Sequence, residues 1–122
     1  MPRAILDEAQ IHPAIRAGVA THHADIVQEV QRAVAAHPVV VVGMGQNPLP
    51  RRARRALDAA GIAHHDLDYG NYFVGWRRRN ALKLWTGWPT MPMIFVRGTL
   101  VGGASDLARL IASGELKRML VA

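Results

Sequence analysis

Hydrophobic residues follow helical and strand-like patterns in alternation along the chain, which predicts an α/β protein. The first helical pattern lies between residues 21 and 37, with apolar positions at Ile26, Val27, Val30, Ala33 and Val34. This spacing places the apolar side chains on one face of a helix, and Thr21 or Asp25 could cap its N-terminus. The helix should end before His37-Pro38, because the residue before a proline disfavours α-helical geometry.

A run of four valines at residues 39–42 predicts a strand buried on both faces. After a turn at residues 43–46, a second helix is expected, because Asn47 is a favoured N-cap and Pro48 suits the first helical position. Gly61 should end this helix, and a short strand at residues 62–67 would complete a right-handed β-α-β unit. The inward positions of the helix are predicted to be Leu49, Ala53, Ala56, Leu57 and Ala60.

The rest of the chain predicts one more helix, a hairpin and two short C-terminal helices. These elements are expected at residues 76–85 (helix), 93–96 and 99–101 (strands joined by a turn at Arg97-Gly98), and 105–112 and 115–120 (helices). The length of 122 residues fits one compact domain. We assign residues 1–20 to an N-terminal extension of weak periodicity and residues 21–122 to the domain.

The chain contains no cysteine, which excludes disulfides, thiolate nucleophiles and cysteine-based metal sites. A histidine metal site is not expected either, because neighbouring strand residues such as His64 and His65 point to opposite faces. No apolar run approaches the roughly 18 to 20 residues that cross a bilayer. The first residues do not resemble a signal peptide, so a soluble, cytoplasmic protein is expected.

The net charge is +6, and 13 of the 15 basic residues are arginine. Such a surface attracts anions, although an arginine-rich bacterial composition would also produce it. Four arginines, Arg51, Arg52, Arg54 and Arg55, fall in the first turns of the second helix, where the helix dipole opposes cations. They are either a solvated face or an anion-attracting rim.

Three motifs, in the expected order, resemble monothiol glutaredoxins. The stretch HADIVQEVQRAVAAHPVVVV resembles their opening helix and strand, and ASGELKRML resembles their C-terminal helix. Between them, WTGWPTMPMIFVRGTLVGGASDL resembles the family's Trp-Pro-Thr element, cis-proline, hairpin and double glycine. The resemblance covers residues 24 to 120 and implies a thioredoxin-like fold, with a central four-stranded mixed sheet flanked by helices.

The sequence departs from that family where the chemistry should lie. The active-site box would be Asn47-Pro48-Leu49-Pro50, which places Asn47 at the position of the nucleophilic cysteine. Met44 stands where monothiol members carry a lysine, and the loop before the box is about five residues shorter. A gap placed in the helix would instead put Arg52 at the nucleophile position. An asparagine amide is more plausible as a helix N-cap than as a nucleophile or a soft iron ligand.

The resemblance implies that a glutathione-binding frame remains. Pro92 would be cis, and the main chain of Met91 would pair with the extended glutathione peptide. Ala104 and Ser105 follow the double glycine at a helix N-terminus, where free N–H groups can hold the γ-glutamyl carboxylate.

Four side chains belong to the implied frame. Ser105 replaces an aspartate that contacts the ligand amine, and Asp106 is the candidate substitute. Arg79 matches the basic residue that pairs with the glycine carboxylate, and Trp88 is expected near the ligand. A plain N-cap at Ser105 and a solvated basic face at residues 77–79 are the alternatives.

We therefore expect a redox-inactive protein that binds glutathione or a glutathionylated or γ-glutamyl partner, without an iron–sulfur cluster. Two alternatives remain: a scaffold module whose pocket is lost, or an anion or nucleic-acid binder that uses the arginine-rich surface. Nucleic acid is the less favoured partner, because composition alone does not support it. The sequence specifies neither a biological partner nor an oligomeric state.

Overall fold

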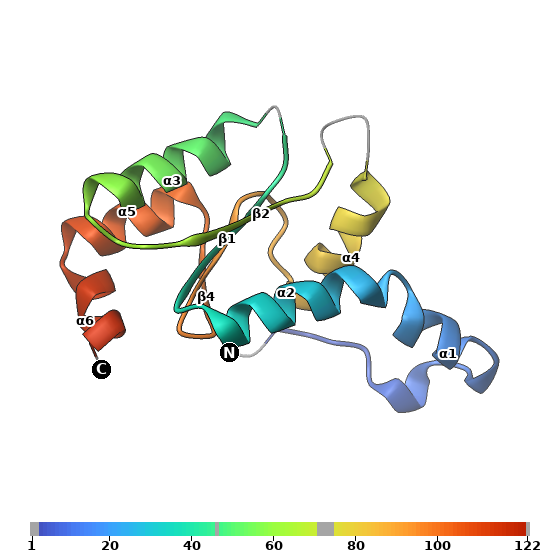
Figure 1. Ribbon diagram of the computed structural model, residues 1–122. Coiled ribbons are helices and arrows are strands. Elements are labelled where there is room, and N and C mark those ends of the chain that lie inside the picture. Colours follow the sequence, from blue (N-terminus) through green and yellow to red (C-terminus); the bar gives the residue numbers. More distant parts are fainter. Residues whose placement is uncertain (1–2, 46, 71–74, 122) are drawn as a thin grey trace.

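A computed structural model describes residues 3–45, 47–70 and 75–121 and shows a sheet between two helical layers (Figure 1). The strands are β1 (Val39–Gly43), β2 (His65–Asp68), β3 (Met93–Val96) and β4 (Thr99–Gly102). The helices are α1 (Pro13–Thr21), α2 (Ala24–Ala36), α3 (Pro48–Ala59), α4 (Trp76–Thr86), α5 (Ala104–Ala112) and α6 (Glu115–Val121), with a short 3-10 helix, η1 (Glu8–Gln10). None of the described helices is long and apolar enough to cross a membrane.

The strand order is β2-β1-β3-β4, with β1 parallel to β2 and antiparallel to β3, and β3 antiparallel to β4. This confirms the predicted four-stranded mixed sheet, with the hairpin at one edge. A two-residue turn at Arg97-Gly98 joins β3 to β4, because Val96 pairs with Thr99.

Alternate residues of the central strands face opposite helical layers. Val40 and Val42 pack toward α2 and α4, whereas Val39 and Val41 pack toward α3, α5 and α6. All four valines are at most 1% exposed, which confirms the strand predicted to be buried on both faces. The core therefore consists of two apolar layers separated by the sheet, as α/β architectures require.

Two helix predictions need correction. Neither Thr21 nor Asp25 caps α2; its N-cap residue is His23, in a left-handed conformation and without a side-chain cap. In α3, Leu49 is 41% exposed and Pro50 is buried in its place. The buried set Pro50, Ala53 and Leu57 has the three- and four-residue spacing of one helix face, so the predicted face was slightly rotated.

The second strand begins later than predicted, at His65. Gly61 does end α3, with φ +71°, and the N–H of Ile62 then donates to the carbonyl of Leu57 at 2.9 Å. Ile62 packs onto the core beside α3. Ile62, which was predicted to begin the strand, therefore belongs to the end of α3. Such an apolar contact often accompanies a glycine C-cap.

The N-terminal extension contains a helix that the periodicity did not predict. Helix α1 has no buried residue, and its only large apolar pair at helical spacing, Ile15 and Val19, is too short a pattern to predict a helix. Its start is local: Pro13 occupies the first turn, and the N–H of Ala14 donates to Nδ1 of His12 at 3.0 Å. Further upstream, the guanidinium of Arg3 lies against Gly87 at the end of α4. The extension therefore contacts the domain.

Candidate functional site

Strand register brings the predicted site segments to one end of the sheet. Val42 of β1 pairs with Met93 of β3, and Ile94 pairs with Gly102 of β4. The end of β1 leads into α3, the start of β3 follows Pro92, and the end of β4 leads into α5. The segments containing Asn47, Met91-Pro92 and Ala104 therefore share that end.

Asn47 acts as the N-cap of α3. The N–H of Leu49 donates to its Oδ1 at 3.0 Å, and Pro48 occupies the first turn. Pro50 is buried against Gly43, where an added Cβ would lie only 2.7 Å from the proline Cβ. The segment at residues 47–50, which the resemblance aligns with the active-site box, is thus the packed first turn of α3. The interpretation of Asn47 as an N-cap is confirmed.

The Met91-Pro92 peptide bond is cis, as predicted. Met91 is 4% exposed, and no turn or loop hydrogen bond among the described residues uses its main-chain N–H or C=O. Trp88 lies close by, because its Cζ2 atom and the carbonyl of Pro92 are each 3.7 Å from a Cβ built on Gly103. The cis-proline loop, Trp88 and the start of α5 are therefore in contact.

The double glycine makes room for the start of α5. Gly102 has φ +112°, and a Cβ there would lie 2.5 Å from Oδ2 of Asp106. That oxygen accepts the N–H of Gly103 at 3.0 Å, so Asp106 caps its own helix. Ala104 is buried and Ser105 is exposed. Ser105 thus lies open at the second position of the helix, whereas one oxygen of Asp106 is already used.

The basic residues at the start of α4 have three different environments. Arg77 is exposed and lies over the ring of Trp76, 5.2 Å from its centroid. Arg78 forms an ion pair with Asp25 of α2 at 2.9 Å. Arg79 is 5% exposed and its Nη1 donates to the carbonyl of Tyr69 at 2.9 Å. Burial lowers the pKa of Arg79. A uniformly solvated basic face does not describe this segment.

The hydroxyl of Tyr69 links this end of β2 to α2. It donates to Oε1 of Glu29 at 2.6 Å, and burial together with this hydrogen bond raises the pKa of Tyr69. The tyrosine therefore stays protonated as a donor and serves the packing of α2 against the sheet. Tyr69 also contacts α4, because its carbonyl accepts a hydrogen bond from Arg79 and Arg78 lies over its ring, 5.9 Å from the centroid.

The arginines of α3 divide into one paired residue and three exposed ones. Arg54 forms ion pairs with Asp66 and Asp68 of β2, whereas Arg51, Arg52 and Arg55 are exposed. The hypothesis of an anion-attracting rim therefore applies only to Arg51, Arg52 and Arg55.

His64 and His65 have different partners, although only His65 lies in β2 and the predicted strand alternation therefore does not apply to the pair. His64 hydrogen bonds to Asp66 at 2.6 Å and to Asp58 at 2.8 Å, whereas His65 stacks on His37. Burial lowers the pKa of His64, but the bonds to the two aspartates outweigh it and raise the pKa above 6.5. Among the described residues, no group of three or more histidine or acidic side chains could hold a metal ion.

Proteins of similar sequence and similar structure are glutaredoxins. The chain is 39% identical over 95 residues to a glutaredoxin-like protein of Dictyostelium discoideum, covering 78% of this chain and 77% of that protein. Oxidized glutaredoxin 2 from Chlamydomonas reinhardtii matches with a TM-score of 0.68 and 29% identity, over 81% of this chain and 94% of its own. The buckwheat glutaredoxin–glutathione complex matches with a TM-score of 0.71 and 24% identity, over 83% of this chain and 92% of its own. No protein-family model matches the chain.

The sheet, the cis-proline and the two flanking helix layers define a thioredoxin-like fold. Within that fold, the chain belongs to the glutaredoxin family. It is a cysteine-free member. Met44 is 8% exposed and lies in the apolar core beside α2. Asn47 and Met44, which the sequence motifs align with the family's cysteine and lysine, are thus a helix cap and a core residue.

The N-cap assignment predicts how Asn47 variants behave. Asn47→Ala should lower the free energy of unfolding by about 1 kcal/mol, because the N–H of Leu49 loses its acceptor. Asn47→Asp should match or exceed the wild type, because a carboxylate accepts the same bond and interacts favourably with the helix N-terminus. Urea unfolding measures both. Equal stability of the alanine variant and the wild type would contradict a capping role.

Proposed function

We propose that this protein recognises glutathione, or the γ-glutamyl or glutathionyl group of a partner, without thiol–disulfide chemistry. The observation that carries the proposal is the shared end of the sheet, where the Met91 main chain, Trp88 and the N-terminus of α5 lie together. These are recognition elements and contain no nucleophile. Residues 1–20 are proposed as an extension outside this recognition frame.

Main-chain groups can supply most of the proposed contacts. The N–H and C=O of Met91 can pair with an extended peptide in the manner of an added strand. The first N–H groups of α5, beside the exposed Ser105, have no acceptor within the helix and can hold a carboxylate. Neither contact depends on a cysteine.

Two further observations support a ligand at this position. The indole Nε1 of Trp88 is buried without a hydrogen-bond partner among the described residues, and such orphan donors are uncommon in folded proteins. In addition, a buckwheat glutaredoxin of the same fold is known in complex with glutathione. An acceptor on the ligand would satisfy the indole if the loop around it adjusts.

The site does not fit an iron–sulfur cluster. Such a cluster needs soft thiolate ligands, and the position of the ligating cysteine holds an amide whose oxygen already caps α3. A pure scaffold role would leave the main chain of Met91 and the start of α5 without a ligand. Glutathione recognition therefore explains more of the described geometry than the scaffold alternative.

An exposed position offers the sharpest test of glutathione binding. Ser105→Asp should bind glutathione about ten-fold more tightly than the wild type, because a carboxylate beside the α5 N-terminus gives the ligand amine a charged acceptor. Ala108→Asp is the matched control, since it adds the same charge at an exposed position of the same helix. Calorimetric titration measures the affinities.

Three outcomes decide the matter. Thermal stabilisation of the wild type by glutathione, with tighter binding by Ser105→Asp alone, supports the proposal. Equal effects of the two aspartates, or no thermal shift at millimolar glutathione, would refute it. Arg79, the proposed partner of the glycine carboxylate, is a poorer test, because Arg79→Ala would also remove a buried structural bond.

The lost chemistry gives an independent prediction. The wild type should show no glutathione-dependent disulfide reductase activity, and it should hold no iron when expressed with iron and sulfide. Asn47→Cys should recover little, because the core residue Met44 provides no cation and Pro50 no N–H to stabilise a thiolate. Visible absorption and iron content measure cluster binding. A cluster band with stoichiometric iron in the wild type would overturn this part of the proposal.

A further inference from the structure

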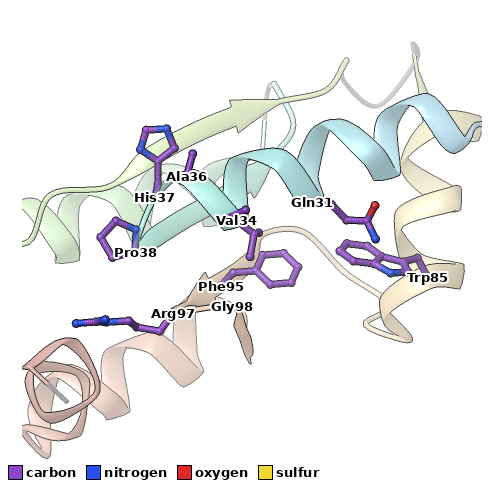
Figure 2. A pocket seen from close by; sticks show the side chains of 10 residues that line it. Gln31, Val34, Ala36, His37, Pro38, Trp85, Phe95, Arg97 and Gly98 are labelled. Atoms are coloured by element: carbon purple, nitrogen blue, oxygen red, sulfur yellow. The ribbon is translucent and has the colours of Figure 1, made fainter.

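A cavity of about 620 Å³ opens on the side of the sheet that α2 covers (Figure 2). Its walls are the C-terminal half of α2 with the link to β1, Trp85 of α4, and the turn between β3 and β4. The volume lies within the range of small-molecule sites, roughly 300 to 1,000 Å³. Nothing in the proposed glutathione frame uses these residues.

The cavity lies at the opposite end of the central strands from the glutathione frame. It is lined by Pro38, which precedes β1, and by Phe95 and Arg97 at the end of β3. Asn47 and Pro92 adjoin the other ends of the same two strands. A strand of four or five residues, at about 3.3 Å per residue, separates the two places by roughly 13 to 17 Å. The two sites are distinct.

Aromatic rings form part of the cavity wall. Trp85 and Phe95 stack with their centroids 5.9 Å apart and their planes 26° apart. Figure 2 shows Phe95 and Val34 in the middle of the cavity, with Gln31 and Trp85 at one end. A flat, apolar ligand body would find aromatic and aliphatic contacts along this length.

Arg97 gives the other end of the cavity a positive charge. Figure 2 shows its side chain at that end, below Pro38 and extending away from Phe95. Its main-chain N–H donates to the carbonyl of Pro38 at 2.8 Å, and its side-chain Nη2 donates to the carbonyl of Leu120 at 2.6 Å. The guanidinium is therefore held by the C-terminal helix. Within the described residues, no carboxylate lies within ion-pair distance of it.

The position of this arginine is costly for the backbone. Arg97 and Gly98 have φ values of +51° and +80°, the combination of a type I′ hairpin turn. Asparagine, aspartate or glycine suits the first position of such a turn, whereas a long side chain is disfavoured in the left-handed region. An unfavoured residue that carries a charge to a cavity indicates a role for the charge.

We propose that this cavity binds a small planar aromatic carboxylate. The aromatic body of the ligand lies along Phe95 toward Trp85, and its carboxylate pairs with Arg97. The lining supports this class because it combines aromatic rings with a cation and includes no acidic residue. The site is independent of glutathione binding and can operate whether or not the glutathione proposal holds.

The probe for this site is 2-naphthoate, with neutral 2-naphthamide as its matched ligand control. Tryptophan fluorescence gives the affinity, and nitrogen–proton correlation spectra locate the bound probe. We expect 2-naphthoate to bind at least about ten-fold more tightly than the amide, the usual effect of a charged hydrogen-bonded pair. The largest amide shifts should fall at residues 31–37 and 95–98.

Arg97→Asn is the decisive variant, because asparagine suits the left-handed turn and the fold should be kept. It should weaken 2-naphthoate binding at least about ten-fold and leave 2-naphthamide binding unchanged. Arg109→Gln removes the same charge from an exposed position of α5 and should change neither affinity. Thermal unfolding checks that both variants are folded.

Several results would overturn the proposal. Equal affinity of Arg97→Asn and the wild type for 2-naphthoate would remove the role of the cation. Equal affinity of the wild type for 2-naphthoate and 2-naphthamide would also exclude a role for the charge of Arg97. Absence of binding at millimolar probe, or amide shifts centred on Met91 and Ser105, would reject the cavity itself.

Discussion

The antiparallel pairing of β1 with β3 is the interaction on which the rest of the structure depends. These two strands occupy the centre of the sheet, and their side chains supply both apolar layers. A shift of one residue would turn every core valine toward the wrong layer, so the register is strongly specified. The same register brings the starts of α3 and α5 to the cis-proline loop. It places the cavity lined by Phe95 and Arg97 at the opposite end of the two strands.

The proposed recognition site relies on main-chain groups, whereas thiol chemistry relies on side chains. The N–H groups at a helix start and the main chain of Met91, a residue only 4% exposed, follow from the fold and tolerate many sequences. A thiolate and its neighbouring cation need particular residues. In this chain Asn47 caps α3 and Met44 fills the core. The proposed recognition of glutathione without thiol chemistry therefore rests on groups other than these two side chains.

The sequence predicted most of the core elements and little of their side-chain pairing. The valine run, the cap at Asn47 and the hairpin have strong local signals and were confirmed. Helix α1 has no buried face, so periodicity could not reveal it. The burial of Arg79 depends on contact between α4 and Tyr69, the residue after β2, which no local pattern encodes. Likewise, the cavity lined by Phe95 and Arg97 joins three elements that are distant in the sequence.

Nitrogen–proton correlation spectra recorded while free glutathione is added would decide whether this cysteine-free frame still recognises its ligand. Recognition without chemistry predicts saturable, reversible shifts at the amides of Met91, Ala104 and Ser105, with no change in protein mass. Shifts confined to other regions, or none at about 10 mM glutathione, a concentration at which even millimolar affinity nearly saturates the site, would contradict it.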